Sequence, residues 1–384
     1  MISKNYTITS LYSSAFLIIS LLTAYFPLWL NKSLELDPKY IGYILSLSGF
    51  LKVLFILILA TIIKTNNSLK NILLYLTLLT ASLFFSVYIF NYYISVNFKL
   101  IITLLFLILF SPILPLIETL YSSIPKSSLN HYGKIRIFGS ISFCLGVLFF
   151  GYLINIFSID LFPLFLFLSL LFMSASILTI PNKLDVTSYD KIKNFKSLFK
   201  DRELLTYLII CSFIQGTHAM YYGYSTIIWE RKGFSYLDIG KLWTFAIISE
   251  IFVFYYAGYF FKSKFLYNSL IFISLIVFLR WMLTYLIDEF YYLAIIQTLH
   301  GITFALTHFI MIYFINLKVA SSLRLMAQTT YFSLTSGLVI TSLTIICGHI
   351  LSYSSQALGF IVMSMIGLLS FTFLFLKRKY YAQK

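Results

Sequence analysis

The stretch SPILPLIETLYSSIPKSSLNHYGKIRIFGS, Ser111 to Ser140, places charged residues inside two apolar segments that are joined by a polar turn. Glu118 lies in the first segment, an apolar helix that we expect Pro112 and Pro115 to break, and Arg136 opens the second one, eighteen residues after the glutamate. If these segments are antiparallel neighbouring helices, the two side chains would lie at similar depth and meet. A carboxylate in hydrocarbon is costly and should face a partner or a water-filled cavity, and prolines fit a helix bent around one. The stretch therefore predicts a membrane-embedded hairpin that forms half of a substrate site.

A simpler interpretation of the same hairpin is also open. Arg136 would then be an ordinary anchor at the cytoplasmic end of its helix. Glu118 would be a structural residue whose carboxyl group is satisfied by its neighbours.

The composition is that of a polytopic membrane protein. Of the 384 residues, 60% are hydrophobic and 11% are charged, whereas about a quarter of the residues of a soluble domain are charged. Apolar runs of about 20 residues, long enough to cross a hydrocarbon core roughly 30 Å thick, recur along the chain. The net charge of +15 does not indicate nucleic acid as a partner, because the basic residues lie between these runs.

We expect an all-α fold of twelve transmembrane helices. The predicted spans are 11–30, 40–63, 70–92, 99–121, 134–155, 160–180, 205–229, 237–261, 266–286, 291–316, 325–351 and 356–376. A long polar segment divides them six plus six. This division predicts an N-terminal six-helix bundle over residues 1–180, a cytoplasmic linker over 181–204 and a C-terminal six-helix bundle over 205–384. The first apolar run has no small-residue cleavage site, so we expect it to remain as the first span.

The basic residues predict the orientation, because lysine and arginine prefer the cytoplasmic side of a membrane. With the N-terminus inside, twenty of the 28 lie in cytoplasmic segments and six in extracellular ones, while Lys52 and Arg280 fall within spans. Both termini and the central loop are therefore expected in the cytoplasm.

The two halves of the chain repeat each other at their second helices. The dipeptide Ile-Gly opens a span at 41–42 and again at 239–240, each time after an extracellular turn. Eleven residues past each isoleucine stands a charge, Lys52 in one half and Glu250 in the other. Internal repeats are typical of secondary transporters, so the pattern predicts two bundles related by an axis along the membrane normal.

Charged and imidazole side chains inside the spans are the candidate site residues. Each charge at a helix centre costs at least about 2.5 kcal/mol on insertion scales, so we expect them to converge on one cavity. The candidates are Lys52, Glu118, Arg136, Glu250, Arg280, His218 and His300, with Tyr221 on a tyrosine-rich face beside His218. Arg280 would either partner Glu250 or keep a neighbouring acid ionised. For each histidine the alternative is a hydrogen-bonded core residue.

The sequence contains no constellation that indicates an enzyme. HExxH, GxSxG, GxGxxG and phosphate-binding lysine motifs are missing, and the three cysteines, Cys144, Cys211 and Cys347, show no metal-ligand spacing. No polar segment is long enough for a nucleotide-binding domain. We therefore expect no catalytic activity, no metal and no cofactor, and a gradient as the energy source.

Six segments resemble, in order and over nearly the whole chain, the phenylpropionate permease group of the major facilitator superfamily. They are SPILPLIETL (111–120), YGKIRIFGSISF (132–143), IQGTHAMYYGYS (214–225), SEIFVF (249–254), FLRWM (278–282) and QTLHGITFALTH (297–308). They are also similar to the proton-coupled galactoside permease family, whose fourth-helix glutamate and fifth-helix arginine match Glu118 and Arg136 in type and spacing. The eighth-helix glutamate, ninth-helix arginine and tenth-helix histidine of that family match Glu250, Arg280 and His300.

The sequence departs from the galactoside family at the coupling site. Thr303 stands where that family has the glutamate that cycles the coupling proton, and Gln297 replaces a lysine. His218 and Tyr221 occupy the places of seventh-helix aspartates. The resemblance implies the major facilitator fold, a monomer and a bacterial cytoplasmic (inner) membrane, but the coupling site does not carry over.

We predict a secondary transporter that works by alternating access and takes up a small organic solute, an aromatic carboxylate such as 3-phenylpropionate. Arg136 and Lys52 would bind the anionic head, because a planar guanidinium matches a carboxylate. His218 and Tyr221 would line the substrate site. Glu118 would have to be protonated or turned away when a carboxylate binds, which keeps sugars and nucleosides open as substrates.

Proton symport is the predicted energy source, with the solute, the proton and the lipid bilayer as partners. Glu118 and Glu250 are the acids that would carry the proton, with Arg280 beside them and His300 as a relay. The alternatives are an exporter of small molecules and a receptor that transports nothing.

Overall fold

The computed structural model describes residues 2–62, 66–123, 132–180, 200–260, 265–354 and 357–382. Within these ranges the regular structure is helical and no strand is formed. Eleven segments are long and apolar enough to cross a membrane. A twelfth, α10 (Tyr236–Phe260), has the length but carries Asp238, Lys241 and Glu250. The predicted all-α fold of twelve spans is confirmed.

The first six spans match the predicted ones to within four residues, except that α1 begins nine residues before the predicted start at residue 11. They are α1 (Ile2–Lys32), α2 (Pro38–Ile62), α3 (Asn66–Ile89), α4 (Val96–Phe110) with α5 (Ile113–Ser123), α6 (Tyr132–Ile156), and the short turn η2 (Ile159–Leu161) with α7 (Phe162–Leu178). The fourth span is broken at Ser111 and Pro112. Pro115 does not break it, contrary to expectation, because it lies in the first turn of α5, where its missing N–H has no helical partner to lose.

The last six spans include three that are interrupted. They are α8 (Arg202–Gly216) with α9 (Ala219–Arg231); α10; α11 (Leu266–Leu286); α12 (Phe290–Thr298) with η5 (Gly301–Leu306) and α13 (Thr307–Lys318); α14 (Ser321–Phe332) with η6 (Ser333–Val339) and α15 (Ile340–Tyr353); and α16 (Gly359–Ala382). The segments η5 and η6 are π-helical. Such segments are rare and frequently lie at functional sites.

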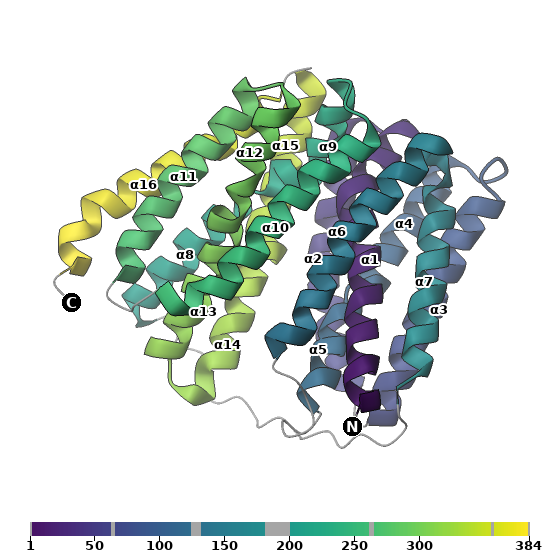
Figure 1. The fold of residues 1–384 in the computed structure, drawn as a ribbon, viewed down its shortest axis with the longest axis horizontal. Helices are drawn as coiled ribbons and strands as arrows, with labels where there is room; N and C mark the ends of the chain where they lie inside the picture. The colour runs from purple at the N-terminus through teal and green to yellow at the C-terminus, as the bar shows by residue number, and fades with distance from the viewer. Residues whose placement is uncertain are drawn as a thin grey trace. The chain divides into compact units, whose positions relative to one another are not determined.

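The helices pack into two compact units. Unit 1 comprises Met1–Leu36, Leu47–Tyr189 and Gly233–Thr244, and unit 2 comprises Asp37–Ser46, Asp190–Lys232 and Phe245–Lys384. In unit 1, α1 packs along α6 and α7, and in unit 2, α11 packs along α16 (Figure 1). The contiguous bundles that the sequence predicts, 1–180 and 205–384, stay a prediction.

An aromatic cluster forms part of the core of unit 1. Trp29 of α1 stacks on Phe162 of α7, with ring centroids 5.3 Å apart, and Phe84 of α3 lies 5.8 Å from Trp29 and 6.3 Å from Phe162. All three side chains are buried. Large buried rings contribute strongly to core packing, so this cluster holds α1, α3 and α7 together.

A buried tyrosine in unit 1 joins three helices through backbone carbonyl groups. The hydroxyl of Tyr25 in α1 donates to the carbonyl of Val147 in α6 at 2.7 Å, and the carbonyl of Tyr236 at the start of α10 lies 3.0 Å from the same hydroxyl. Gly240, one turn along α10, permits this close approach, because a Cβ atom there would lie 2.6 Å from the Val147 carbonyl oxygen.

Unit 2 contains the same arrangement built from other residues. The hydroxyl of Tyr224 in α9 donates to the carbonyl of Thr344 in α15 at 2.9 Å and lies 3.3 Å from the carbonyl of Pro38 at the start of α2. A Cβ atom at Gly42 would lie 2.7 Å from the Tyr224 hydroxyl. The internal repeat predicted from the Ile-Gly dipeptides is therefore confirmed at this contact, which occurs once in each unit.

Removing either hydroxyl should weaken its unit. Tyr25→Phe and Tyr224→Phe are each expected to lower the free energy of unfolding by about 1 kcal/mol, the net value of a buried hydrogen bond. The thermal unfolding midpoint of the purified protein in detergent measures this. Tyr92→Phe is the control, since Tyr92 is 95% exposed and its change should stay within about 0.5 kcal/mol. Equal midpoints for all three variants would contradict the structural role of the two hydroxyls.

Candidate functional site

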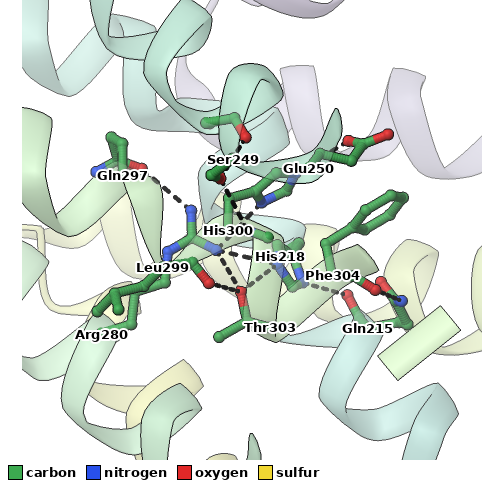
Figure 2. Close-up of polar contacts among 12 residues, drawn as sticks. Gln215, His218, Ser249, Glu250, Arg280, Gln297, Leu299, His300, Thr303 and Phe304 are labelled. Carbon is green, nitrogen blue, oxygen red and sulfur yellow. Dashed lines mark hydrogen bonds and ion pairs between the residues drawn. The ribbon is translucent and has the colours of Figure 1, made fainter. Parts of the chain in front are cut away.

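A guanidinium is buried at the centre of unit 2. Arg280 of α11 is 0% exposed, and its Nη1 lies 2.6 Å from Thr303 Oγ1 (Figure 2). The same nitrogen lies 3.1 Å from His218 Nε2 and 3.2 Å from His300 Nδ1, and Nη2 lies 3.1 Å from Gln297 Oε1. Among the residues that the structure describes, no carboxylate lies within 4.0 Å of Arg280. Each of its polar partners is either an uncharged side chain or a histidine, which can be neutral.

Helix interruptions bring these partners to Arg280. His218 lies at the break between α8 and α9, where its backbone N–H donates to the carbonyl of Gln215, three residues back. Gln297, His300 and Thr303 follow one another at three-residue steps through the junction of α12 and η5, so they lie on one face. The π-helical turn is thus part of the construction of the site.

Arginine fixes the positions of the imidazole protons, because it donates hydrogen bonds and cannot accept them. His218 Nε2 must accept from Arg280, so the proton of His218 is on Nδ1, which donates to the carbonyl of Gln215 at 3.1 Å. His300 Nδ1 must accept as well, so its proton is on Nε2. Both imidazoles are neutral in this arrangement, and protonating either would place a second positive charge beside the guanidinium.

Glu250 of α10 lies at the edge of this cluster. Its Oε2 is 3.7 Å from His300 Nε2, and its side chain is 16% exposed, against 2% for His300. The backbone holds this position: Gly301 N–H donates to Ser249 Oγ at 3.0 Å, and a Cβ atom at Gly301 would lie 2.6 Å from the Ser249 carbonyl oxygen. Because α10 and η5 touch here, the Glu250 carboxylate faces the N–H of His300.

Aromatic rings enclose the guanidinium. The Cζ atom of Arg280 lies 4.2 Å from the ring centroid of Trp281 and 5.1 Å from that of Tyr221, distances at which a ring face attracts a cation. Trp281 stacks on Phe360 at 5.6 Å, and His300 stacks on Phe304 at 5.0 Å. The cluster combines one positive charge with apolar ring faces, which suits an organic anion that carries an aromatic group.

Five of the candidate residues predicted from the sequence come together here: His218, Tyr221, Glu250, Arg280 and His300. The expected contact of Arg280 with Glu250 is not formed. His300 stands between them, because its ring contacts the guanidinium through one nitrogen and faces the carboxylate through the other.

The remaining candidates lie in unit 1. Glu118 is half-buried in α5, and Lys52 is half-buried in α2. Arg136 belongs to α6, but its side chain lies outside the described residues. The pairing of Glu118 with Arg136 therefore stays a prediction.

The sequence marks Gln297 and Thr303 only as departures from the galactoside family and does not mark Trp281, so none of the three is a predicted site residue. The available signals are the three-residue steps from Gln297 through His300 to Thr303 and the position of Trp281 next to Arg280. Neither signal is specific, since polar residues at helical spacing occur on many helices. In the described part of the chain, no group of His, Cys, Asp and Glu side chains could hold a metal ion.

Comparisons with known proteins agree on the family. The model of the MFS_1 like family matches residues 6–362. The chain is 26% identical over 360 residues, 93% of each protein, to a probable 3-phenylpropionic acid transporter of Escherichia coli (strain K12). It is 23% identical over 261 residues, 68% of this chain and 65% of the other, to an uncharacterized transporter of Bacillus subtilis (strain 168).

Solved structures share the fold. The crystal structure of a mutant of the nucleoside transporter NupG is similar with a TM-score of 0.78, over 97% of this chain and 98% of that one, at 15% identity. A bacterial homologue of the human lysosomal transporter Spinster, inward-facing and occupied, gives a TM-score of 0.67 over 98% of this chain and 96% of that one, at 11% identity. At these identities the likeness extends to the fold alone.

The two imidazoles should carry their protons on different nitrogens. With histidines labelled with nitrogen-15, the spectrum at neutral pH is expected to show His218 as the Nδ1–H tautomer and His300 as the Nε2–H tautomer, because Arg280 donates to the other nitrogen of each ring. His218→Asn and His300→Asn assign the signals among the 5 histidines. An imidazolium signal from either ring, or the same tautomer for both, would contradict this layout.

Proposed function

The chain belongs to the MFS_1 like family and is a membrane transporter of the major facilitator type, and we propose that it takes up an aromatic carboxylate such as 3-phenylpropionate together with protons. The observation that carries this proposal is Arg280, a fully buried guanidinium with no carboxylate within 4.0 Å among the described residues. Buried charges are ordinarily paired, so an anionic substrate would supply the missing negative charge. The Escherichia coli relative, a probable 3-phenylpropionic acid transporter, supports the same substrate class.

The surroundings of Arg280 favour an aromatic anion over a sugar or a nucleoside. A planar guanidinium binds a carboxylate through two parallel hydrogen bonds, and the ring faces of Trp281 and Tyr221 lie beside it. Arg136 and Lys52 are also proposed, from the sequence, to bind the anionic head of the substrate. His218 lines the site through its contact with Arg280.

Glu250 is the acid whose protonation would couple the entry of protons to the entry of the carboxylate. Protonating His218 or His300 would add a positive charge next to Arg280, whereas protonating Glu250 only removes a negative one. With Glu250 ionised, the cluster is neutral as a whole and has no net attraction for an anion. With Glu250 protonated, the cluster carries one positive charge and favours an anion, so the proton and the carboxylate would bind together. Glu118 is the second acid proposed for this role.

Uptake would proceed by alternating access, the mechanism of transporters built from repeats. We propose a monomer in the bacterial cytoplasmic membrane, as the family resemblance implies, with both termini in the cytoplasm. The distribution of basic residues supports this orientation.

Substrate addition to de-energised cells tests the proposal. In a lightly buffered suspension of cells that express the protein, 3-phenylpropionate should raise the external pH, because protons enter with the anion. Glu250→Gln should abolish this rise and still exchange labelled substrate across the membrane, since glutamine resembles the protonated acid. Glu118→Gln, tested in parallel, identifies which acid carries the proton.

Other solutes added one at a time test the substrate class. A rise in pH with a galactoside or a nucleoside, and none with 3-phenylpropionate, would overturn the aromatic carboxylate. Entry of labelled 3-phenylpropionate without any pH change would overturn proton coupling and leave a uniporter or a different driving ion.

A further inference from the structure

Some N–H donors of Arg280 have no hydrogen-bond acceptor among the described residues. A guanidinium has five N–H donors. The two at Nη1 face three acceptors, whereas Nη2 has only Gln297 Oε1, and Nε has no acceptor among the described residues. One N–H of Nη2 and the N–H of Nε are therefore left without an acceptor in a side chain that is 0% exposed.

Gln297 adds two more donors of the same kind. Its side chain is 0% exposed, and Arg280 fixes the amide orientation because only the carbonyl oxygen of glutamine accepts a hydrogen bond from a guanidinium. The amide nitrogen Nε2 has no acceptor within the described chain. In Figure 2 Gln297 lies on the side of the guanidinium away from Glu250.

Four buried N–H groups on two adjacent side chains thus point to an acceptor that the described residues do not supply, because buried polar groups nearly always have partners. We propose that Arg280 and Gln297 form the receptor for the carboxylate of the transported anion, whose oxygens accept from Arg280 Nε, Arg280 Nη2 and Gln297 Nε2. The assignment of the ligand as the transported substrate rests on the proposed function. The receptor itself is inferred from the buried N–H donors that have no acceptor among the described residues.

The chemistry of the donors selects the class of ligand. An ionised carboxylate only accepts hydrogen bonds and has two oxygens with about four lone-pair positions, which matches a site that offers donors alone. A hydroxyl or a water molecule must also donate, and an amine would meet a like charge. Entry of the anion requires the rings over the guanidinium, Tyr221 and Trp281, to move in another state of the transport cycle.

Binding to the purified full-length protein tests the receptor. Isothermal titration calorimetry would compare 3-phenylpropionate with its neutral analogue 3-phenylpropionamide, and the wild type is expected to bind the carboxylate at least about tenfold more tightly, since charge-assisted hydrogen bonds are the stronger ones. Gln297→Leu removes the amide donors together with the acceptor of Arg280 Nη2, and should weaken carboxylate binding about tenfold.

Gln297→Glu provides the sharper variant. The introduced carboxylate would pair with Arg280 from within, so binding of 3-phenylpropionate should be lost and the thermal unfolding midpoint should not fall. Thr298→Val is the matched control on α12, because the Thr298 hydroxyl is exposed and donates only to the carbonyl of Ile295. The dissociation constant of this variant for 3-phenylpropionate should stay within about twofold of the wild-type value.

The outcomes separate the receptor from the proposed function. Wild-type affinity for 3-phenylpropionate in both Gln297 variants, or equal binding of the amide by the wild type, would overturn the receptor even if uptake with protons occurs. If 3-phenylpropionate is neither bound nor taken up, but acetate or benzoate stabilises the wild type and not Gln297→Glu, the receptor holds and the proposed substrate fails. No stabilisation of the wild type by any carboxylate would overturn both.

Discussion

A buried guanidinium with no carboxylate within 4.0 Å among the described residues is the constraint on which the interior of unit 2 depends. Because Arg280 only donates, every side chain that forms a hydrogen bond with it must offer an acceptor, and this requirement sets the neutral tautomers of His218 and His300 and the amide orientation of Gln297. The ring faces of Trp281 and Tyr221 supply the remaining attraction. The cluster is left with more donors than acceptors, which is the property that an anion would complement.

Charge balance links this cluster to transport. Glu250 stands one imidazole away from Arg280, so the two opposite charges influence each other without forming a direct ion pair that would hold the site closed. The neutral histidine between them keeps the carboxylate and the guanidinium apart. Glu250, at the partly exposed edge of the cluster, could gain or lose a proton while Arg280 stays charged. The proposed coupling between a proton and an anion requires such a change.

The internal repeat supplies the scaffold, and the functional chemistry breaks the repeat. Tyr25 and Tyr224 make the same backbone contacts in their units, yet the positions that follow the two Ile-Gly dipeptides carry opposite charges, Lys52 and Glu250. The same packing contact can form in both units because a tyrosine hydroxyl that donates to a backbone carbonyl beside a glycine does not depend on the surrounding charge. The proposed site for one proton and one anion would need different groups at corresponding places.

The sequence by itself determined the number and length of the spans, because apolar runs of membrane-spanning length are local, and it identified His218, Glu250, Arg280 and His300, because ionisable groups in such runs are costly. It also indicated the repeat through two short dipeptides. Only the tertiary structure decided which groups meet. Arg280 contacts residues from α9, α12 and η5 that are distant along the chain, and the π-helical turn that aims His300 and Thr303 at it has no marker that helical periodicity reveals. Glu250 faces His300 because α10 and η5 approach at Gly301, and such a backbone contact between two helices is a property of their packing.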